Sequence, residues 1–327
     1  MLKRFIDHCA TTKVFDGCRK VLIALSGGAD SLALTELMIG SRQRFALELA
    51  IAHFDHGLRQ TSADDAAFVK NFAHERGLEF VDASGDVKTF AVKHKLSIET
   101  AARTLRYEFL SDARQRTNCD AIATAHHADD QAETILMRLL RGATSAGLSA
   151  MKTRTVTDCG LILRPLLTFR KAELETFCRE RNLSPCVDET NFMPDVTRNK
   201  IRLELVPLLE KFNSAPVETL CRFGQVAADE ADFIDTQAEK IFATVVRDNK
   251  IVRADFVTLH PALQRAVVKK FLATVTGTTK DFGFVHIEGI RRVLLDGLSG
   301  VELPKNLRAN LKRGKLAVTK NSTHSNG

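Results

Sequence analysis

The sequence predicts an α/β protein with a doubly wound, mostly parallel sheet, followed by a smaller, mainly helical C-terminal domain. In the first half, short apolar runs alternate with segments whose apolar residues recur at helical spacing, which is typical of βαβ units. Beyond the turn at Asn213–Pro216, helical patterns follow one another, and strand patterns return only near the end. We therefore expect domains at 1–215 and 216–327, which suits a chain of 327 residues.

The first domain is expected to alternate strands with helices. Strands are predicted where apolar runs end in turn residues, at Val21–Leu25, Leu47–His53, Glu79–Asp82 and Asp120–Ala125. Apolar periodicity predicts helices at Leu32–Gly40, Ala63–Arg76, Ser97–Thr117, Asp129–Arg141, Lys171–Asn182 and Asn199–Lys211. In such a sheet, ligands bind beyond the C-terminal ends of the strands, where the turns after Leu25, His53 and Ala125 lie.

The second domain is expected to hold helices and to end in a basic segment. Helices are predicted at Val217–Val246, Pro261–Val275 and Val285–Leu295, with short strands within 301–319. Residues 301–320 carry six basic side chains and one acid, Glu302, and the whole chain has a net charge of +7. This charge permits a polyanionic partner. With no Trp and a single Tyr, an aromatic platform for many bases is not expected.

The composition excludes several classes of protein. Hydrophobic residues make up 44% and charged residues 27%, which is ordinary for a soluble globular protein. No apolar run approaches the ~20 residues of a membrane span, and Met1–His8 lacks the apolar core of a signal peptide. We therefore expect a cytoplasmic location. The seven cysteines are scattered without a Cys-x-x-Cys pair, so neither a disulfide framework nor a cysteine-rich zinc site is expected.

The loop Ser26-Gly27-Gly28-Ala29-Asp30-Ser31 lies between an apolar strand and a predicted helix. Gly27 and Gly28 allow the backbone to approach a phosphate closely, and the N–H groups of the first helical turn then face it. No Gly-x-x-x-x-Gly-Lys-Ser/Thr motif occurs in the chain, so this is not the loop of a P-loop kinase. An ordinary turn capped by Ser26 or Ser31 is the alternative.

Two histidines, His53 and His56, follow the second predicted strand. A zinc site would need further ligands beside this pair, and a solvent-facing loop is a simpler alternative. Their position on the ligand-binding edge of the sheet favours nucleotide binding. On the helix predicted at Ser97–Thr117, Glu99, Arg103 and Arg106 share one face. They form either a solvated salt-bridge ladder or a surface with an arginine that faces phosphates.

The segment His126-His-Ala-Asp-Asp130-Gln-Ala-Glu133 opens a helix directly after an apolar strand. Asp129 or Asp130 can cap that helix, but capping accounts for only one acid. The spacing of His126, Asp130 and Glu133 allows them to reach one side of the junction between strand and helix. A dinuclear metallohydrolase could use such a cluster, but magnesium carried by ATP is the more economical interpretation.

Further along the chain, Leu163-Arg164-Pro165 ends another apolar run, and residues 196–202 carry Arg198, Lys200 and Arg202 with no acid. The second group is either a solvated helix start or a contact with a phosphate backbone.

Taken in order, these blocks resemble the PP-loop ATP pyrophosphatase superfamily and, within it, the tRNA(Ile)-lysidine synthetase family. The resemblance runs from Val21 to about Leu209 and continues more weakly through Val285–Val318. It departs from the family pattern at Ala143-Thr144, where the family usually has Ser-Gly. The chain also looks short beside the longer members, as if it lacks their extra C-terminal domain.

The resemblance implies a Rossmann-like PP-loop fold and an ATP-dependent ligase. Such an enzyme joins free L-lysine to C2 of the wobble cytidine of isoleucine tRNA with a CAU anticodon, through an adenylated intermediate. ATP gives AMP and pyrophosphate. The resemblance makes 1–215 the ATP-binding catalytic domain and 216–327 the tRNA-binding domain. We also allow for a homodimer.

The same resemblance assigns roles to residues. The phosphates of ATP fall to Ser26, Gly27, Gly28, Ala29, Asp30 and Ser31, with His53 and His56 also binding ATP. The resemblance also implies that Asp30 and Asp130 bind Mg²⁺ and that Arg106 and His126 stabilise the charge of the adenylate. Glu133 would hold or deprotonate the substrate lysine. The residues expected to bind tRNA phosphates are Arg198, Lys200, Arg202, Arg308, Lys312 and Arg313.

Three other functions compete with this one. A tRNA thiolase would need a reactive cysteine pair or an iron–sulfur site, which the absent Cys-x-x-Cys disfavours. A glutamine-dependent amidating synthetase would need an N-terminal cysteine, and residue 2 is Leu. A non-catalytic nucleotide- or tRNA-binding module would leave the acidic cluster at 126–133 without a use.

Overall fold

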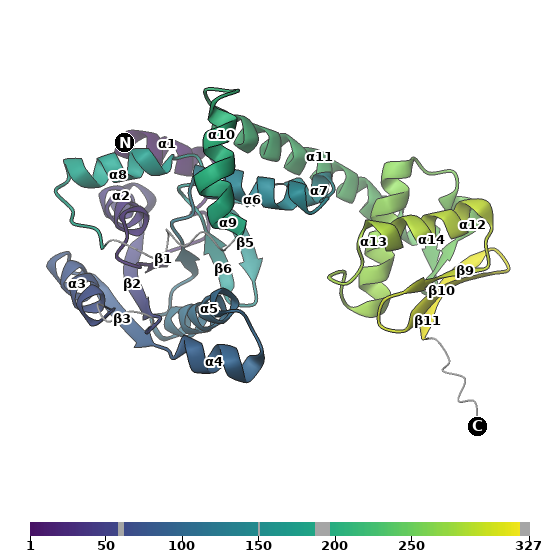
Figure 1. Cartoon of the computed structure of the whole chain (residues 1–327), viewed down its shortest axis with the longest axis horizontal. Helices are drawn as coiled ribbons and strands as arrows, with labels where there is room; N and C mark the ends of the chain where they lie inside the picture. The colour runs from purple at the N-terminus through teal and green to yellow at the C-terminus, as the bar shows by residue number, and fades with distance from the viewer. Residues whose placement is uncertain (58–61, 150, 187–196, 321–327) are drawn as a thin grey trace. The chain divides into compact units, whose positions relative to one another are not determined.

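The computed structural model describes residues 1–57, 62–149, 151–186 and 197–320, which form two compact units (Figure 1). The first unit comprises Met1–Arg141 and Ala150–Phe223, and the second comprises Gly142–Ser149 and the chain from Gly224 onward. The division falls within one long helix, α11 (Pro216–Val245), rather than at the turn that precedes it. The turn at Asn213–Pro216 starts this helix, and the helix then contributes residues to both units.

The first unit is built on a six-stranded sheet in the order β3-β2-β1-β4-β6-β5. Its strands are β1 (Lys20–Ala24), β2 (Glu48–Asp55), β3 (Glu79–Ser84), β4 (Ala121–Ala123), β5 (Arg154–Thr157) and β6 (Gly160–Leu163). Neighbouring strands are parallel except β5, which pairs antiparallel with β6. The predicted doubly wound, mostly parallel sheet is therefore confirmed.

The strand order changes direction between β1 and β4. From β1 the chain continues outward to β2 and β3, and it then returns to the opposite side of β1 with β4 and β6. Ligands in open α/β sheets bind at such a reversal, beyond the carboxyl ends of the strands. The loop Ser26–Ser31 follows β1 and the segment 126–133 follows β4, so both lie at this point.

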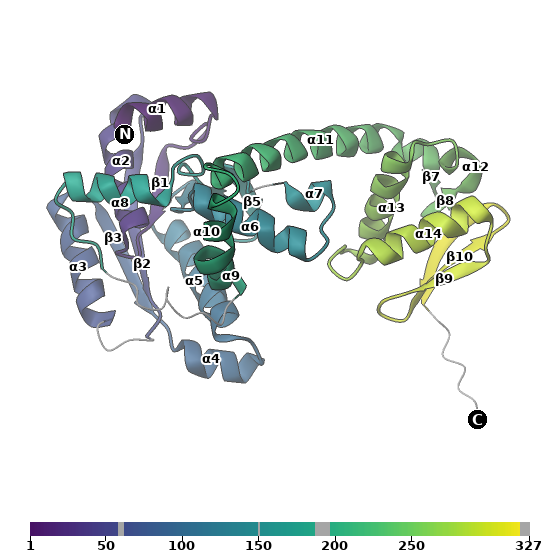
Figure 2. The same ribbon diagram turned by 45° about the horizontal axis from the view of Figure 1, so that its top comes forward.

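Alternation along the strands gives the sheet two covered faces. Val21 and Ile23 pack in a large core with α1 (Leu2–Thr11), α2 (Ala29–Phe45) and α8 (Lys171–Glu180), whereas Leu22 packs on the other face with α5 (Ile98–Arg116). Figure 2 shows these helices around the sheet. The other helices of this unit are α3 (Ser62–Glu75), α4 (Val87–His94) and α6 (Ala128–Leu140).

Two parts of the first unit differ from the prediction. The hairpin β5–β6 was not predicted, because its strands are only four residues long and show no clear alternation. The helix predicted at Asn199–Lys211 is α9 (Thr197–Lys200), a π-helical stretch (Ile201–Leu205) and α10 (Val206–Glu210). Pro207 cannot donate a backbone hydrogen bond and crowds the preceding turn, which explains the widening of the helix there.

The second unit contains helices α7 (Ser145–Leu148), α12 (Arg253–Phe256), α13 (Pro261–Thr276) and α14 (Phe284–Asp296) and an antiparallel sheet. The sheet has the order β7-β8-β11-β10-β9, with β7 at Val246–Arg247, β8 at Lys250–Val252, β9 at Gly300–Leu303, β10 at Leu307–Lys312 and β11 at Lys315–Lys320. Phe256, Phe271 and Leu316 are among the buried residues of its core. The predicted helical region with terminal strands is confirmed, and β7 and β8 extend the sheet. Across the part of the chain with a described structure, no helix is both long and apolar enough to span a membrane.

Candidate active site

The glycine loop, Ser26–Ser31, is closed by its own serines. The Ser26 N–H donates to Ser31 Oγ at 3.2 Å, and Ser31 Oγ donates to the Gly28 carbonyl at 2.9 Å. Neither serine caps α2, whose N-cap is Gly28 and which has no side-chain cap hydrogen bond. The first N–H groups of a 17-residue helix therefore point out of the loop, which is the arrangement that binds a phosphate.

Gly27 is the residue that the loop geometry requires to be glycine. Its φ is +89°, and a Cβ there would lie 3.1 Å from Cys186 Sγ and 3.4 Å from Val69 Cγ2. Its carbonyl accepts a hydrogen bond from the Cys186 N–H at 3.0 Å. A side chain at position 27 would therefore strain the backbone and displace the neighbouring segment.

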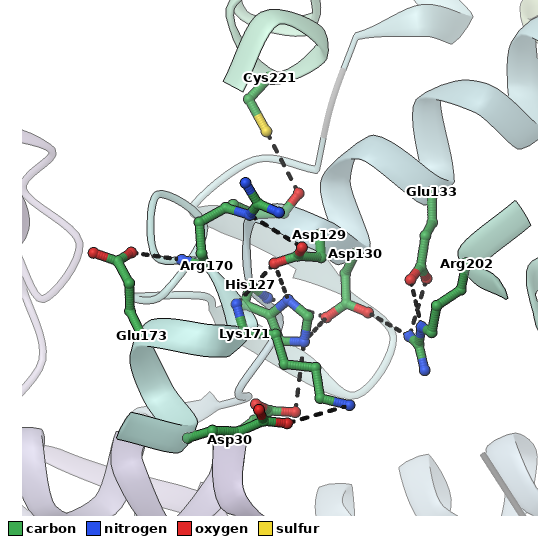
Figure 3. A network of polar contacts seen from close by, with 12 residues as sticks. Asp30, His127, Asp129, Asp130, Glu133, Arg170, Lys171, Glu173, Arg202 and Cys221 are labelled. Atoms are coloured by element: carbon green, nitrogen blue, oxygen red, sulfur yellow. Dashed lines mark hydrogen bonds and ion pairs between the residues drawn. The ribbon is translucent and has the colours of Figure 1, made fainter. Parts of the chain in front are cut away.

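His127 lies at the centre of three carboxylates (Figure 3). Its Nε2 is 3.5 Å from Asp30 of the glycine loop and 3.5 Å from Asp130, while its Nδ1 is 3.5 Å from Asp129. The imidazole is 3% exposed. The loop after β1 and the helix after β4 are thus joined by one buried ring.

The charge of this ring follows from its neighbours. Burial opposes protonation of His127, but Asp129, Asp30 and Asp130 outweigh it and raise its pKa to about 10. In return, although burial acts in the other direction, the imidazolium helps to hold the pKa values of Asp129 and Asp130 below their usual range. At neutral pH His127 is therefore a buried cation surrounded by carboxylates.

The two aspartates of α6 have different structural tasks. Asp130 Oδ2 accepts the His127 N–H at 3.1 Å and so caps the helix. Asp129 accepts the Lys171 N–H at 2.8 Å and Arg170 Nε at 3.1 Å, and Arg170 also donates to Glu218 at 2.8 Å. Asp129 therefore ties α6 to the start of α8, and Asp130 keeps an oxygen that faces the site.

Glu133 is buried and neutralised by two arginines. Arg198 Nε donates to its Oε2 at 2.8 Å and Arg202 Nε to its Oε1 at 2.6 Å, while both guanidinium groups lie 3.7 Å from Asp130 Oδ1. The predicted tRNA contacts Arg198 and Arg202 thus point into the acidic cluster. A buried carboxylate on the facing helix outcompetes solvent for them. Lys200 alone of the three is exposed.

His126 and Arg106 lie at the other border of the site. Burial lowers the pKa of His126 to about 3, and Arg164, Arg106 and Arg198 add to this against the opposing effect of Asp130. Its Nδ1 is 2.9 Å from Thr124 Oγ1. His126 is therefore a neutral ring beside cationic side chains.

His53, on β2, and His56, directly after this strand, both contact neighbouring residues of the protein. His53 is buried, and its Nδ1 lies 2.8 Å from the Leu25 carbonyl, which fixes the end of β1 beside β2. His56 packs edge-on against Phe54, with ring centroids 5.0 Å apart. The segment 58–61, which follows this strand end, lies outside the described ranges.

The basic residues predicted to bind tRNA in the second unit lie on the hairpin β10–β11. Arg308 pairs with Glu302, whereas Lys312 and Arg313 are exposed at the turn, where Arg313 and Gly314 have positive φ.

The residues present are compatible with Mg²⁺ held by few protein ligands. Among the described residues, no group of three or more His, Cys, Asp or Glu side chains has the geometry of a complete metal site. Asp30 Oδ1 is nevertheless buried without a hydrogen-bond partner in this part of the chain, next to Asp130. Mg²⁺ commonly binds one or two carboxylates and completes its shell with phosphate oxygens and water, so this donor set fits.

Sequence reasoning assigned no role to His127 or Arg170, and it gave Asp129 only as a candidate helix cap. The pattern at 126–133 contains two adjacent histidines; the spacing grouped His126 with the acids, whereas His127 is the ring that lies between the carboxylates in the structure. The useful signal was the position of His127 at the helix N-cap, three residues before Asp130 at the third helical position. Arg170 could not be found, because it approaches from α8, 41 residues further along the chain.

Comparisons with known proteins agree with this architecture. The family model described as the PP-loop domain matches residues 2–209. A tRNA(Ile)-lysidine synthase from Geobacter sulfurreducens is 35% identical over 98% of this chain and 69% of its own length. One from Dehalococcoides mccartyi is 34% identical over 88% of this chain, which spans 64% of that relative. The U34-tRNA thiolase NcsA from Methanococcus maripaludis shares the fold, with a TM-score of 0.57 at 19% identity over 69% of this chain and 79% of its own.

The fold and the loop at its switch point define a PP-loop protein. The chain belongs to the tRNA(Ile)-lysidine synthase family.

Proposed function

We propose that this protein ligates free L-lysine to C2 of the wobble cytidine of the CAU-anticodon isoleucine tRNA in the cytoplasm. ATP is the energy source, and AMP and pyrophosphate are the products. The observation that carries the proposal is the approach of Asp30, from the glycine loop, and Asp130, from α6, to the same nitrogen of His127. The glycine loop and a buried acidic cluster therefore meet at one point of the sheet.

The first step is adenylation. The C2 oxygen of the cytidine attacks the α-phosphorus of ATP, and the bond to the pyrophosphate leaving group breaks. The N–H groups at the start of α2 bind phosphate oxygens, and Arg106 with the neutral His126 offers donors to the charge that develops. Asp30 and Asp130 would hold Mg²⁺, which neutralises phosphate charge when bound.

The second step is attack of the lysine ε-amine on C2. A C–N bond forms, the C2–O bond breaks, and the oxygen leaves with AMP. The amine must be neutral to attack, although its ordinary pKa is about 10.4, so a carboxylate has to accept its proton. We assign this lysine to Glu133, whose two oxygens are engaged by Arg198 and Arg202 in the structure. Lysine binding therefore requires one of these guanidinium groups to move.

The proposal is tested with purified protein, ATP, Mg²⁺, labelled lysine and tRNA. Label should enter the isoleucine tRNA with the CAU anticodon, with one AMP released for each lysine incorporated. ATP hydrolysis without lysine incorporation, or lysine incorporation without AMP release, would contradict the proposal.

A further inference from the structure

Arg164 is a buried cation without an acidic partner among the described residues. It is 9% exposed, and its Nη1 donates to the Lys152 carbonyl at 2.9 Å and to Thr155 Oγ1 at 2.8 Å. Within the described ranges its Nε is buried without a hydrogen-bond partner, and no carboxylate there pairs with it. Burying an uncompensated charge is expensive in free energy. Two neutral acceptors hold the group in place but do not balance its charge.

The sheet register places Arg164 beside the active site. Leu163 of β6 pairs with Ala123 of β4, so Arg164 lies level with Thr124, whose hydroxyl contacts His126. Ile162, two residues earlier on the strand, packs in the core formed with α5. Because side chains two apart on a strand share a face, Arg164 lies on the α5 face of the sheet.

Helix α5 adds two more cations on that face. The guanidinium groups of Arg103 and Arg106 lie 4.9 and 5.3 Å from the centre of the Tyr107 ring. Arg106 Nε and the Tyr107 hydroxyl are buried without partners in the described part of the chain. No ion pair joins Glu99 to either arginine among the described residues, so the salt-bridge ladder does not form. Burial and the charge of Arg103 lower the pKa of Arg164 despite Tyr107, which agrees with their closeness.

We propose that Arg103, Arg106 and Arg164 form a phosphate-binding site on the α5 face, distinct from the glycine loop that opens α2 on the other face. Planar guanidinium groups with free N–H donors recognise phosphate oxygens in pairs. The ligand is a nucleotide phosphate, which comes either from the adenylate or from the RNA backbone beside the reacting base. Its identity as a nucleotide rests on the proposed function, whereas the binding of an anion does not.

The test measures binding without lysine or turnover, so that its failure is separate from failure of the ligase activity. Isothermal titration calorimetry of the full chain uses three probes: AMP, inorganic pyrophosphate and a CAU anticodon stem–loop RNA. The RNA is also used with a methylphosphonate on either side of the wobble cytidine. R164Q should weaken at least one probe by about tenfold, with R164K intermediate because it keeps the charge but not the fork.

Two further variants keep the result interpretable. R103Q changes an exposed side chain, so it should fold normally. It should weaken binding of the same probe, and it therefore tests the proposal even if R164Q does not fold. R154Q removes an arginine of the same hairpin that donates to the backbone carbonyls of Lys13, Val14 and Asp16, so it should lower thermal stability without changing affinity.

The outcomes distinguish the sources of the phosphate. Weaker binding of AMP assigns the site to the phosphate of the adenylate, and weaker binding of pyrophosphate assigns it to the other phosphates of ATP. The RNA backbone is the source if R164Q binds the RNA more weakly than wild type does, and if a methylphosphonate beside the wobble cytidine weakens RNA binding to wild type but not to R164Q. Unchanged affinity for all three probes in a folded R164Q or R103Q, or no binding of any probe to the wild type, would overturn the proposal.

Discussion

Asp30 and Asp130 both lie 3.5 Å from His127 Nε2, although one follows β1 and the other follows β4. The imidazolium lies between these two carboxylates, which are the ones that we assign to Mg²⁺. It therefore keeps the acidic cluster assembled when no metal or nucleotide is bound. This relationship gives the protein a preformed site in which a buried cation offsets part of the acidic charge before the substrates arrive.

Replacement of His127 should destabilise the first unit. H127Q removes the cation from three partly buried carboxylates, and breaking a buried charge cluster in this way costs about 3 kcal/mol. Urea unfolding of the variant, followed by circular dichroism, measures the loss. Addition of ATP with Mg²⁺ should recover more stability in H127Q than in wild type, since a bound ligand that neutralises the acids stabilises the folded state. An equal response of both proteins would contradict the assigned role.

Asp130→Asn should abolish lysidine formation while leaving tRNA binding nearly intact. The amide cannot supply the negative charge that we assign to the metal and the reacting centre, but its oxygen can still accept the His127 N–H. Turnover should fall by about a thousandfold or more. Single-turnover assays and filter binding of tRNA provide the two measurements. Normal turnover in this variant would remove Asp130 from the reaction.

Glu133→Gln should raise KM for lysine by about tenfold or more, because it removes a charged partner of the substrate ammonium group. The KM for ATP should change much less. R202M serves as the matched variant, since it frees one oxygen of Glu133 and should change lysine binding without loss of the carboxylate. Steady-state kinetics with each substrate varied in turn separate the two. An effect of E133Q on ATP alone would contradict the role in lysine binding.

Lys312→Ala combined with Arg313→Ala should weaken tRNA binding and flatten its salt dependence. Both side chains are exposed on the β10–β11 hairpin. Each lost phosphate contact should reduce the slope of log K against log salt by roughly 0.7–0.9. Replacing Lys250, an exposed base on β8 of the same sheet, provides the control, with little change expected. An identical slope in the double variant would exclude the hairpin from the interface.

The stability of the second unit should depend on Glu288 at acid pH. Burial acts to raise the pKa of Glu288, but hydrogen bonds from Arg265 and Arg291 outweigh it and hold the pKa below its usual range. The stabilisation is therefore present above the unfolded pKa of about 4.3 and is lost as pH falls through the lower folded value. E288Q should unfold more easily at pH 7 and show a shallower loss of stability between about pH 5 and pH 3. Equal pH dependence in both proteins would contradict this.

The sheet could be predicted because its central strands carry continuous apolar runs that end in motif residues. The glycine loop and the acids of α6 could be placed at one edge for the same reason. The partners that arrive from distant segments could not be predicted. From the sequence, Arg198 and Arg202 are interpreted as exposed basic residues. Only their packing against α6 shows that both donate to the carboxylate of Glu133. Likewise, the buried position of Arg164 depends on the short hairpin β5–β6, which has no clear periodicity.

The most direct measurement is mass analysis of the nucleosides of isoleucine tRNA after reaction with ATP, Mg²⁺ and lysine. The account predicts that the wobble cytidine is replaced by lysidine. The purified wild-type protein should perform this conversion without any other protein, and D130N should not. An unmodified cytidine after complete ATP turnover, or a sulfur-containing nucleoside when a sulfur donor is present, would contradict it.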